Sequence, residues 1–411
     1  MTLPRNKRNS YISQQVPVLA RKEVTTAREL GSGGFCAVST IRKIMLNPQQ
    51  EVNLVDEEKE ARARLYRKFS TYEKIYFDPN RIVVPGRTEE RDPLEQRPPR
   101  IALKELKSNL PAGRYKIGVR DLMAEISILA RCQHPNIISI YAVGCDFKTD
   151  NAASKEESDE ISVLSSSLIA NRRLSFAIID QLRSTLRSKL QKWKDEQSIQ
   201  FMKPNQQRDL WLERLMVMLK ISDAVSYLHS KKIIHRDINP QNVGFGDDDV
   251  LKLFDFGLAT TIVDEENNDA TGVELDCDQL FNLTGTTGTL RYMAPEVGLD
   301  MPYGFKADIY SVTLVMYECL SLKKPYMHVQ PQKFVEQVMK DGIRPDIENE
   351  NFPPKVKQLL RDGWASDIGK RPTALQIVER LGELLRGKDE DLYPINRGVI
   401  AKFDALWKRC V

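Results

Sequence analysis

Two short polar segments, separated by an apolar stretch, constrain this chain more than any other feature. The first reads His-Arg-Asp-Ile-Asn-Pro-Gln-Asn at residues 235–242, and the second reads Asp-Phe-Gly at residues 255–257. The stretch 250–254 between them predicts a strand. The carboxylates of Asp237 and Asp255 and the amide of Asn242 are therefore expected on neighbouring loops. An ordinary turn would explain one such segment but not both, and hard oxygen ligands of this kind suit Mg²⁺.

Further motifs follow one another along the chain. They are a glycine-rich stretch at 30–38, Ile-Ala-Leu-Lys at 101–104, Glu125, Ala-Pro-Glu at 294–296, Asp308 and Arg371. In this order they resemble the eukaryotic protein kinases over roughly residues 27–385. Gly-Thr at 288–289, followed by Arg-Tyr-Met at 291–293, is similar to serine/threonine kinases of the tyrosine-kinase-like branch. The resemblance implies an α+β fold with two lobes, a small mainly β lobe with one key helix and a large mainly α lobe.

The resemblance also divides the chain into segments. We expect an N-terminal tail at 1–26, the small lobe at 27–180, the large lobe at 181–385 and a C-terminal tail at 386–411. Insertions are expected near 45–99, which is helical in pattern before a proline-rich part, and at 148–172, which is rich in Ser, Asp and Glu. Aromatic residues of the first insertion, including Tyr66 and Phe69, either pack on the small lobe or form a docking face. The activation loop is expected at 255–296.

A nucleotide-binding half is predicted in the small lobe. Glycines at 31, 33 and 34 allow a backbone turn to approach phosphate oxygens, although a structural hairpin can show the same pattern. By the resemblance, Lys104 contacts the α- and β-phosphates of ATP and pairs with Glu125; a solvated surface pair is the alternative. The other residues that the family places around ATP are Leu30, Gly31, Ser32, Gly33, Gly34, Val38, Ala102, Ile179 as gatekeeper, Asp180 and Leu182 in the hinge, and Asp255.

A catalytic half is predicted in the large lobe. By the resemblance, Asp237 accepts or orients the substrate hydroxyl, and Asn242 and Asp255 hold Mg²⁺. The expected catalytic residues are thus Asp237, Lys104 and Asn242, and the expected reaction is transfer of the γ-phosphate of ATP to serine or threonine hydroxyls of proteins. Tyrosine or dual specificity stays open. Glu296 and Arg371 are expected to form a buried ion pair, and Asp308 to hold the backbone of the catalytic loop.

Four positions depart from the family pattern. Serine/threonine kinases place a lysine where this chain has Asn239, and tyrosine kinases place an arginine where it has Gln241. Cys36 replaces a third spaced glycine, and Gly244 replaces a leucine. The missing cation would have stabilised the negative charge of the transition state, and its absence is expected to weaken that stabilisation by roughly a few kcal/mol. A pseudokinase scaffold or nucleotide-binding regulatory module is therefore the alternative function, and a small-molecule kinase of related fold is a remoter one.

Composition narrows the partners. The chain has 61 basic and 57 acidic residues, so we expect neither nucleic acid nor a membrane surface as an obligate partner. No apolar run reaches the ~18–20 residues of a membrane span. Six cysteines without paired spacing suit the cytoplasm or the nucleus. The expected partners are ATP, a protein substrate and an upstream activating kinase, because Arg236 precedes the catalytic aspartate and Thr284, Thr286 and Thr287 of the activation loop are candidates for a phosphate that neutralises it. The alternatives are that the acidic run at 264–280 occupies Arg236 in place of a phosphate, or that these threonines only form turns.

Overall fold

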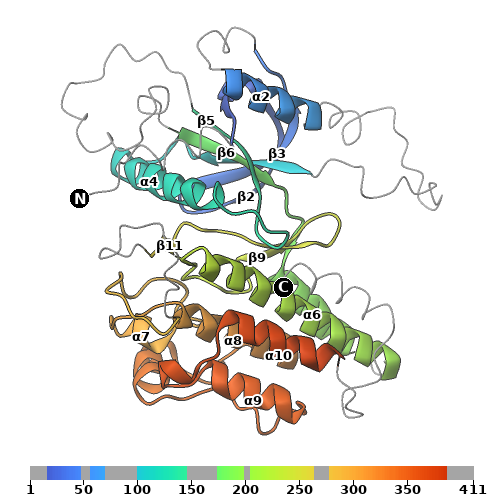
Figure 1. Cartoon of the computed structure of the whole chain (residues 1–411), viewed down its shortest axis with the longest axis vertical. Coiled ribbons are helices and arrows are strands. Elements are labelled where there is room, and N and C mark those ends of the chain that lie inside the picture. Colours follow the sequence, from blue (N-terminus) through green and yellow to red (C-terminus); the bar gives the residue numbers. More distant parts are fainter. Residues whose placement is uncertain are drawn as a thin grey trace. The chain divides into compact units, whose positions relative to one another are not determined.

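The structure is a computed structural model, and it describes residues 16–47, 56–69, 100–145, 174–198, 204–262 and 277–386. These residues divide into two compact units (Figure 1). The first unit takes the described residues up to 133, then 138–182 and 246–249, and the second takes 134–137, 183–245 and those from 250 onward. The insertion expected at 148–172, the C-terminal tail after residue 386 and most of the acidic run at 264–280 lie outside the described residues.

A six-stranded sheet forms the centre of the first unit. Its strand order is β1-β5-β6-β4-β3-β2, and every neighbouring pair is antiparallel except β1 with β5. The strands are β1 (Val18–Ala20), β2 (Val24–Ser32), β3 (Cys36–Ile44), β4 (Ile101–Leu106), β5 (Ile140–Cys145) and β6 (Leu174–Asp180). Two helices contact this sheet, α2 (Asp56–Phe69) at β1 and α4 (Ala112–Leu129) at β4, β5 and β6.

Strand β1 corrects the expected N-terminal boundary. It pairs in parallel with residues 143–145 of β5 and is followed by the short helix η1 (Arg21–Glu23). The close approach needs a glycine on β5, because a Cβ at Gly144 would lie 2.4 Å from the carbonyl oxygen of Leu19. Glu23 is ion-paired with Arg62 of α2 at 2.5 Å, and neither side chain is more than 3% exposed. The prediction of a tail is therefore wrong for residues 18–26, because they belong to the sheet and to its buried polar contacts.

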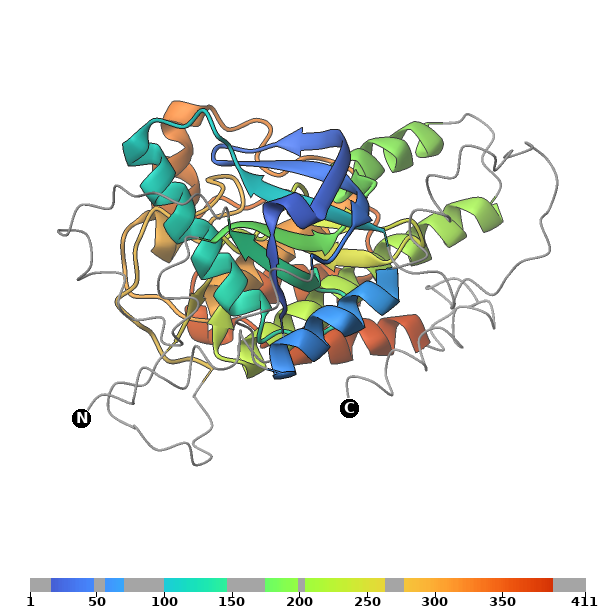
Figure 2. The same cartoon turned by 90° about the horizontal axis from the view of Figure 1, so that it is seen from above.

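The two faces of the sheet carry different side chains. The register places Val38 opposite Lys104 and Ala102 opposite Ile179, so these four residues share one face. The other face buries an apolar core that includes Leu103 and Ile178 of the sheet and Leu65 and Phe69 of α2. Figures 1 and 2 show α2 and α4 lying along the sheet. Of the aromatic residues in the insertion, Phe69 packs on the unit while Tyr66 is 44% exposed.

The second unit is mainly helical. Its helices are α5 (Leu186–Gln197), α6 (Pro204–Ser230), α7 (Pro295–Gly298), α8 (Lys306–Ser321), α9 (Pro354–Gly363) and α10 (Ala374–Arg386), with the short helices η4 (Pro331–Lys333), η5 (Val335–Lys340) and η6 (Ile368–Lys370). Helix α6 packs against both α8 and α10 (Figure 1). It buries Met218, Ile221, Val225 and Leu228 completely, at the spacing of one helical face. The α+β fold class, with a mainly β first part and a mainly α second part, is confirmed.

Short strands position the loops of the second unit. The strands β7 (Ser184–Thr185), β9 (Val243–Phe245) and β10 (Leu251–Leu253) form one sheet, and β8 (Ile233–Ile234) pairs with β11 (Thr260–Thr261). The segment 235–242 thus runs from β8 to β9, and Asp-Phe-Gly at 255–257 follows β10. No helix among the described residues is both long enough and apolar enough to span a membrane.

Candidate active site

The glycine-rich turn joins β2 to β3 in the first unit. Gly31 and Ser32 still pair with β3, and Gly33 closes the turn by donating its N–H to the carbonyl of Cys36 at 2.8 Å. A Cβ at Gly31 or Gly34 would meet no atom within 4 Å. Internal packing therefore does not require these glycines, and a turn that keeps its backbone clear of side chains suits the close approach of a ligand.

Lys104 and Glu125 form the expected ion pair. Lys104 lies on β4 and Glu125 lies on α4. The Nζ of Lys104 is 2.5 Å from Oε2 of Glu125. The side chains are only 17% and 7% exposed, so the pair is not the solvated surface pair that the sequence alone left open. Lys104 lies on the face of the sheet that also carries Val38, Ala102 and Ile179. The four residues that the resemblance places around a nucleotide are thus gathered on one face.

Asp180, at the end of β6, directs its side chain into its own unit. Its carboxylate accepts hydrogen bonds from the N–H of Ser139 at 2.8 Å and from the hydroxyl of Tyr141 at 2.7 Å. Burial and the nearby carboxylate raise the pKa of Tyr141, which therefore stays a hydrogen-bond donor. The ring of Tyr141 packs edge-on against Phe69 of α2, with 5.3 Å between the centroids. The side chain of Asp180 therefore connects the expected hinge to α2 through Tyr141. Only the backbone of Asp180 is left for the expected contact with a nucleotide.

In the second unit, four neutral donors orient the carboxylate of Asp237. Its Oδ1 accepts from the N–H of Thr289 at 2.8 Å, from the hydroxyl of Thr289 at 2.7 Å and from the amide of Asn239 at 3.0 Å. Its Oδ2 accepts from the amide of Asn242 at 2.7 Å. Asn239 also donates to the Thr289 hydroxyl at 3.1 Å. The segment 235–242 and the segment before Ala-Pro-Glu thus meet at one carboxylate, and no cation among the described residues forms an ion pair with it.

Gly288 allows this meeting. Its φ is +104°, and a Cβ there would lie 2.3 Å from the carbonyl oxygen of Arg236 and 3.4 Å from Oδ1 of Asp237. Any other residue would be both strained and obstructed at this position. The Gly-Thr pair is therefore required by the geometry, since the glycine lets Thr289 reach Asp237.

Asp308 of α8 holds the backbone that leads into the catalytic loop. Its two oxygens accept from the N–H groups of His235 and Arg236, each at 2.9 Å, and Oδ2 also lies 3.0 Å from Nε2 of His229. Burial alone would raise the pKa of Asp308, but the hydrogen bond and charge of His229, with the contribution of His235, lower it below its ordinary value. These contacts keep Arg236 at a φ of +67°, which is costly for a residue with a side chain. The expected structural role of Asp308 is confirmed.

Asn242 and Asp255 are suited to Mg²⁺. Asn242 uses its amide nitrogen on Asp237, so its oxygen is presented as an acceptor. Asp255 is exposed and has a φ of +65°, while the next residue, Phe256, is fully buried against His235. No group of three or more His, Cys, Asp or Glu that could hold a metal occurs in the described part of the chain.

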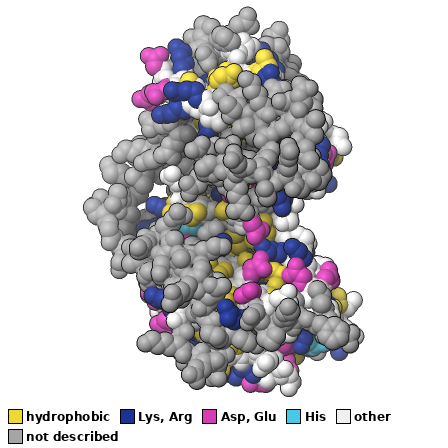
Figure 3. Space-filling model, turned by 90° about the vertical axis from the view of Figure 1, so that its right-hand side faces the viewer, with side chains coloured by type: hydrophobic (Ala, Val, Ile, Leu, Met, Phe, Trp, Pro, Cys, Tyr) yellow, Lys and Arg dark blue, Asp and Glu magenta, His cyan; other side chains and the backbone are white. Residues whose placement is uncertain are grey.

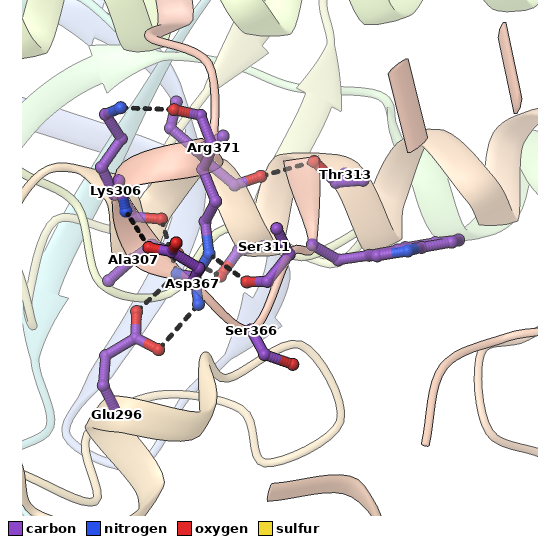
Figure 4. A network of polar contacts seen from close by, with 12 residues as sticks. Glu296, Lys306, Ala307, Ser311, Thr313, Ser366, Asp367 and Arg371 are labelled. Carbon is purple, nitrogen blue, oxygen red and sulfur yellow. Dashed lines mark hydrogen bonds and ion pairs between the residues drawn. The ribbon is translucent and has the colours of Figure 1, made fainter. Parts of the chain in front are cut away.

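Glu296 and Arg371 form the expected buried ion pair (Figure 4). The contact is bidentate, with 2.5 Å from Nη1 to Oε1 and 2.9 Å from Nη2 to Oε2, and the side chains are 5% and 0% exposed. Arg371 also donates to the carbonyls of Lys306 at 3.1 Å and Ala365 at 2.9 Å. The pair therefore joins the segment at Ala-Pro-Glu to α8 and to the loop before α10.

Asn239 is the residue whose role the sequence analysis missed, since it stood there only as a departure. It is 2% exposed, and its Oδ1 accepts from the N–H of Gln241 at 2.8 Å. This contact fixes the orientation of the amide, so that its nitrogen faces Asp237 and Thr289. An Asn followed by Pro in a loop is a signal for a side chain that bonds the backbone two residues on, but no local signal indicates the contact with Thr289.

Comparison with known proteins agrees with this geometry. The chain matches the protein-family model described as a protein kinase domain over residues 95–381, which is more than half of its length. It is 35% identical over 177 residues to serine/threonine-protein kinase STY17 of Arabidopsis thaliana, covering 43% of this chain and 28% of that protein. It is 34% identical over 170 residues to serine/threonine-protein kinase VIK of the same plant, covering 40% and 36%. With dual specificity protein kinase shkE of Dictyostelium discoideum it shares 33% identity over 177 residues, covering 42% and 23%.

The chain therefore belongs to the protein kinase domain family. Its similarity to STY17 and VIK agrees with the tyrosine-kinase-like branch that the Gly-Thr and Arg-Tyr-Met motifs indicate. The matched region spans only about a quarter to a third of the length of these plant relatives.

Proposed function

We propose that this chain transfers the γ-phosphate of ATP to serine and threonine hydroxyls of proteins. The observation that carries the proposal is the orientation of Asp237 by Thr289, Asn239 and Asn242. Oδ1 of the aspartate accepts three donors and Oδ2 accepts one, so Oδ2 has capacity for a substrate hydroxyl. In the proposed reaction Asp237 accepts the hydroxyl proton while the substrate oxygen bonds to phosphorus and ADP leaves.

Residues of the first unit are proposed to bind the ATP. Lys104, held by Glu125, contacts the α- and β-phosphates, and the backbone N–H groups of residues 31–34 face the phosphate oxygens. The N–H of Gln181 already donates to the carbonyl of Arg100 at 2.9 Å, so adenine recognition is assigned to the backbone of Leu182 and the carbonyl of Asp180. Asn242 and Asp255 of the second unit would hold Mg²⁺, which neutralises phosphate charge when bound.

The alternative is a nucleotide-binding scaffold, and Asn239 favours it because no cation stands two residues after the catalytic aspartate. Incubation of the purified protein with labelled ATP and Mg²⁺, followed by phosphoamino-acid analysis, tests both functions together. We expect labelled phosphoserine and phosphothreonine with the wild type and background label with Asp237→Asn. Equal label in the two proteins would reject the proposed reaction, and phosphotyrosine would reject the proposed acceptor.

We also propose that an upstream kinase activates the chain. The guanidinium of Arg236 donates to the carbonyl of Leu258 and to the hydroxyl of Tyr303 at 3.3 Å, and among the described residues it forms no ion pair with an acid. The Tyr303 hydroxyl in turn donates to the carbonyl of Thr284 at 2.7 Å. A phosphate on Thr284, Thr286 or Thr287 would bring the missing anion to this arginine.

The matching experiment combines mass spectrometry of the active protein with alanine at all three threonines. We expect one or more phosphorylated threonines and a several-fold loss of turnover in the variant. Full activity with an unmodified loop would leave the acidic run at 264–280 as the better partner for Arg236.

The cytoplasm or the nucleus is the proposed compartment, because the six cysteines of the sequence show no paired spacing. A protein rather than a nucleic acid is the proposed substrate. The nearly balanced charge of the chain supports this, and acidic and basic side chains both occur on the face shown in Figure 3.

A further inference from the structure

A hollow of about 1150 Å³ lies in the second unit between α5 and the segment that follows α8. Its charged lining includes Arg187 and Lys194 of α5, Glu318 of α8, and Lys323, Lys324 and Glu350 beyond α8. None of these residues belongs to the site around Asp237. The hollow therefore needs an explanation of its own.

The hollow borders the catalytic loop. At one side, the N–H of Arg187 donates to the carbonyl of Pro240, which lies inside the segment 235–242. At the other side, Glu318 accepts a hydrogen bond from the hydroxyl of Tyr292, three residues after the Thr289 that binds Asp237. An extended peptide advances ~3.3–3.6 Å per residue. A substrate with its hydroxyl at Asp237 would thus bring residues only a few positions away to this hollow.

The acids of the hollow are already occupied. Glu318 is 4% exposed, and its oxygens accept from Arg187 at 3.1 Å and from the Tyr292 hydroxyl. Glu350 is ion-paired with Lys323 at 2.5 Å. Asp346, also in the lining, accepts from the N–H of Glu348 in its own loop at 2.9 Å. An incoming basic side chain would therefore find no acid without an existing partner in this lining.

Lys324 is in the opposite situation. It is partly buried, and among the described residues it makes no ion pair. Burial and the neighbouring cations Arg187 and Arg291 lower the pKa of its ammonium group, with Glu318 as the one acid that opposes them. Three cations thus share one carboxylate that is already hydrogen-bonded twice. An anion placed here would relieve the repulsion among them.

We propose that this hollow is a subsite for an anionic side chain of the protein substrate, a carboxylate or a phosphate that lies a few residues from the phosphorylated hydroxyl. Lys324 is its central contact, and Arg187 lies at its edge nearest the catalytic loop. The proposal rests on the proposed protein kinase function and adds the charge preference of its substrates. Because Glu318 and Glu350 of the lining are already ion-paired, it predicts selection against basic residues at the same substrate position.

The test is a set of peptides with one serine and a single varied position, scanned through the four residues on each side of it. The varied residue is glutamate, phosphoserine, glutamine or lysine. With the wild type we expect kcat/KM for the glutamate or phosphoserine peptide to exceed that for the glutamine peptide by about five- to tenfold at one or two positions, the size of one charge-assisted contact. The glutamate and phosphoserine arms distinguish acidic substrates from substrates that are already phosphorylated.

Two variants assign the preference to the hollow. Lys324→Glu is expected to lose the preference or to turn it toward the lysine peptide, with the preference measured as the ratio of kcat/KM for each peptide to that for the glutamine peptide in the same variant. Lys333→Glu is the matched control, because it makes the same charge change at an exposed residue of η4 outside the hollow, and it should keep the wild-type preference. The same preference in Lys324→Glu as in the wild type, or a wild-type preference for glutamine or lysine, would overturn the proposal.

Peptide binding separates this proposal from the proposed activity. If the wild type phosphorylates no peptide and does not label itself, the proposed kinase function fails, and fluorescence anisotropy with the same peptides still tests the subsite. Tighter binding of the glutamate or phosphoserine peptide that is lost in Lys324→Glu supports the subsite. Equal binding of all the peptides rejects it.

Discussion

The two units of this molecule depart from the family pattern in different ways. In the first unit the pair of Lys104 with Glu125 follows the pattern and Cys36 replaces a spaced glycine, while β1, α2 and the buried pair of Glu23 with Arg62 extend the framework. In the second unit the ion pair of Glu296 with Arg371 follows the pattern, while Asn239 stands in place of a cation beside Asp237, the proposed base.

The difference teaches how each kind of change is accommodated. Helix α2 packs on the face of the sheet opposite to Lys104 and β1 lies at the edge of the sheet, so both extend the apolar core and leave the face that carries Lys104 unchanged. The change in the second unit lies beside the proposed base, and it is accommodated because the amide of Asn239 makes hydrogen bonds with three neighbouring residues.

The largest effect is expected from Asp237→Asn, which tests whether the departure in the second unit has left catalysis intact. Loss of the base should lower kcat by about 10²- to 10⁴-fold, because the group acts on the acceptor hydroxyl. The affinity for ATP should change by less than about twofold, since the residues assigned to ATP are elsewhere. Steady-state kinetics and nucleotide titration check the two numbers. An unchanged kcat would show that the second unit does not perform the chemistry.

The next largest effect is expected on stability when either of the two buried ion pairs is broken. Arg371→Leu and Arg62→Leu each leave a buried carboxylate without its partner, so each should lower the free energy of unfolding by about 3–5 kcal/mol. Urea denaturation measures both, and Lys59→Leu at an exposed pair with Asp56 is the control, with a change below about 1 kcal/mol.

The double variant Glu23→Leu/Arg62→Leu sharpens this comparison, because it removes both buried charges and should recover most of the loss. A stable Arg62→Leu protein would mean that the addition to the first unit is dispensable, unlike the pair of the second unit.

A smaller effect is expected at Asn239. Asn239→Ala removes donors to Asp237 and Thr289 and should lower kcat about tenfold, the cost of roughly one hydrogen bond to a charged group. Asn239→Lys restores the cation of the family pattern and should raise kcat above the wild type if the rest of the site is competent. Steady-state kinetics with KM for ATP checks both. A loss of activity in Asn239→Lys would show that the amide network, including the bond from Gln241, matters more than the cation.

The smallest effect is the acid sensitivity that Asp308 gives to the second unit. Because the folded state lowers the pKa of Asp308, its contribution to stability is complete above its ordinary value of 3.8 and is lost as the pH falls through the lower, folded pKa. Below about pH 4 the free energy of unfolding should fall more steeply in the wild type than in Asp308→Asn, by at most about 1.4 kcal/mol per pH unit.

Urea denaturation between pH 5 and 3 measures this difference, with the exposed Asp56→Asn as a control that keeps the wild-type slope. His229 and His235 face the same carboxylate, so His229→Gln should reduce the difference. If the free energy of unfolding changed equally with pH in the wild type and in Asp308→Asn, the lowered pKa of Asp308 would be contradicted.

The order of motifs in the sequence predicted the fold class, the pair of Lys104 with Glu125, the pair of Glu296 with Arg371 and the role of Asp308. Such motifs can be read locally, because each requires particular residue types at one place in the chain. The turn glycines and the apolar face of α6 are local in the same sense, since their patterns repeat within a few residues.

Tertiary structure alone decided the placement of residues 18–26, the pairing of Glu23 with Arg62, and the contact of Asn239 with Thr289. Each of these joins segments about 40 to 125 residues apart, and a short strand, a single carboxylate or one amide carries no local pattern that names its distant partner. The same holds for the cations around Lys324, which come from separate segments and repel one another only because the fold brings them together.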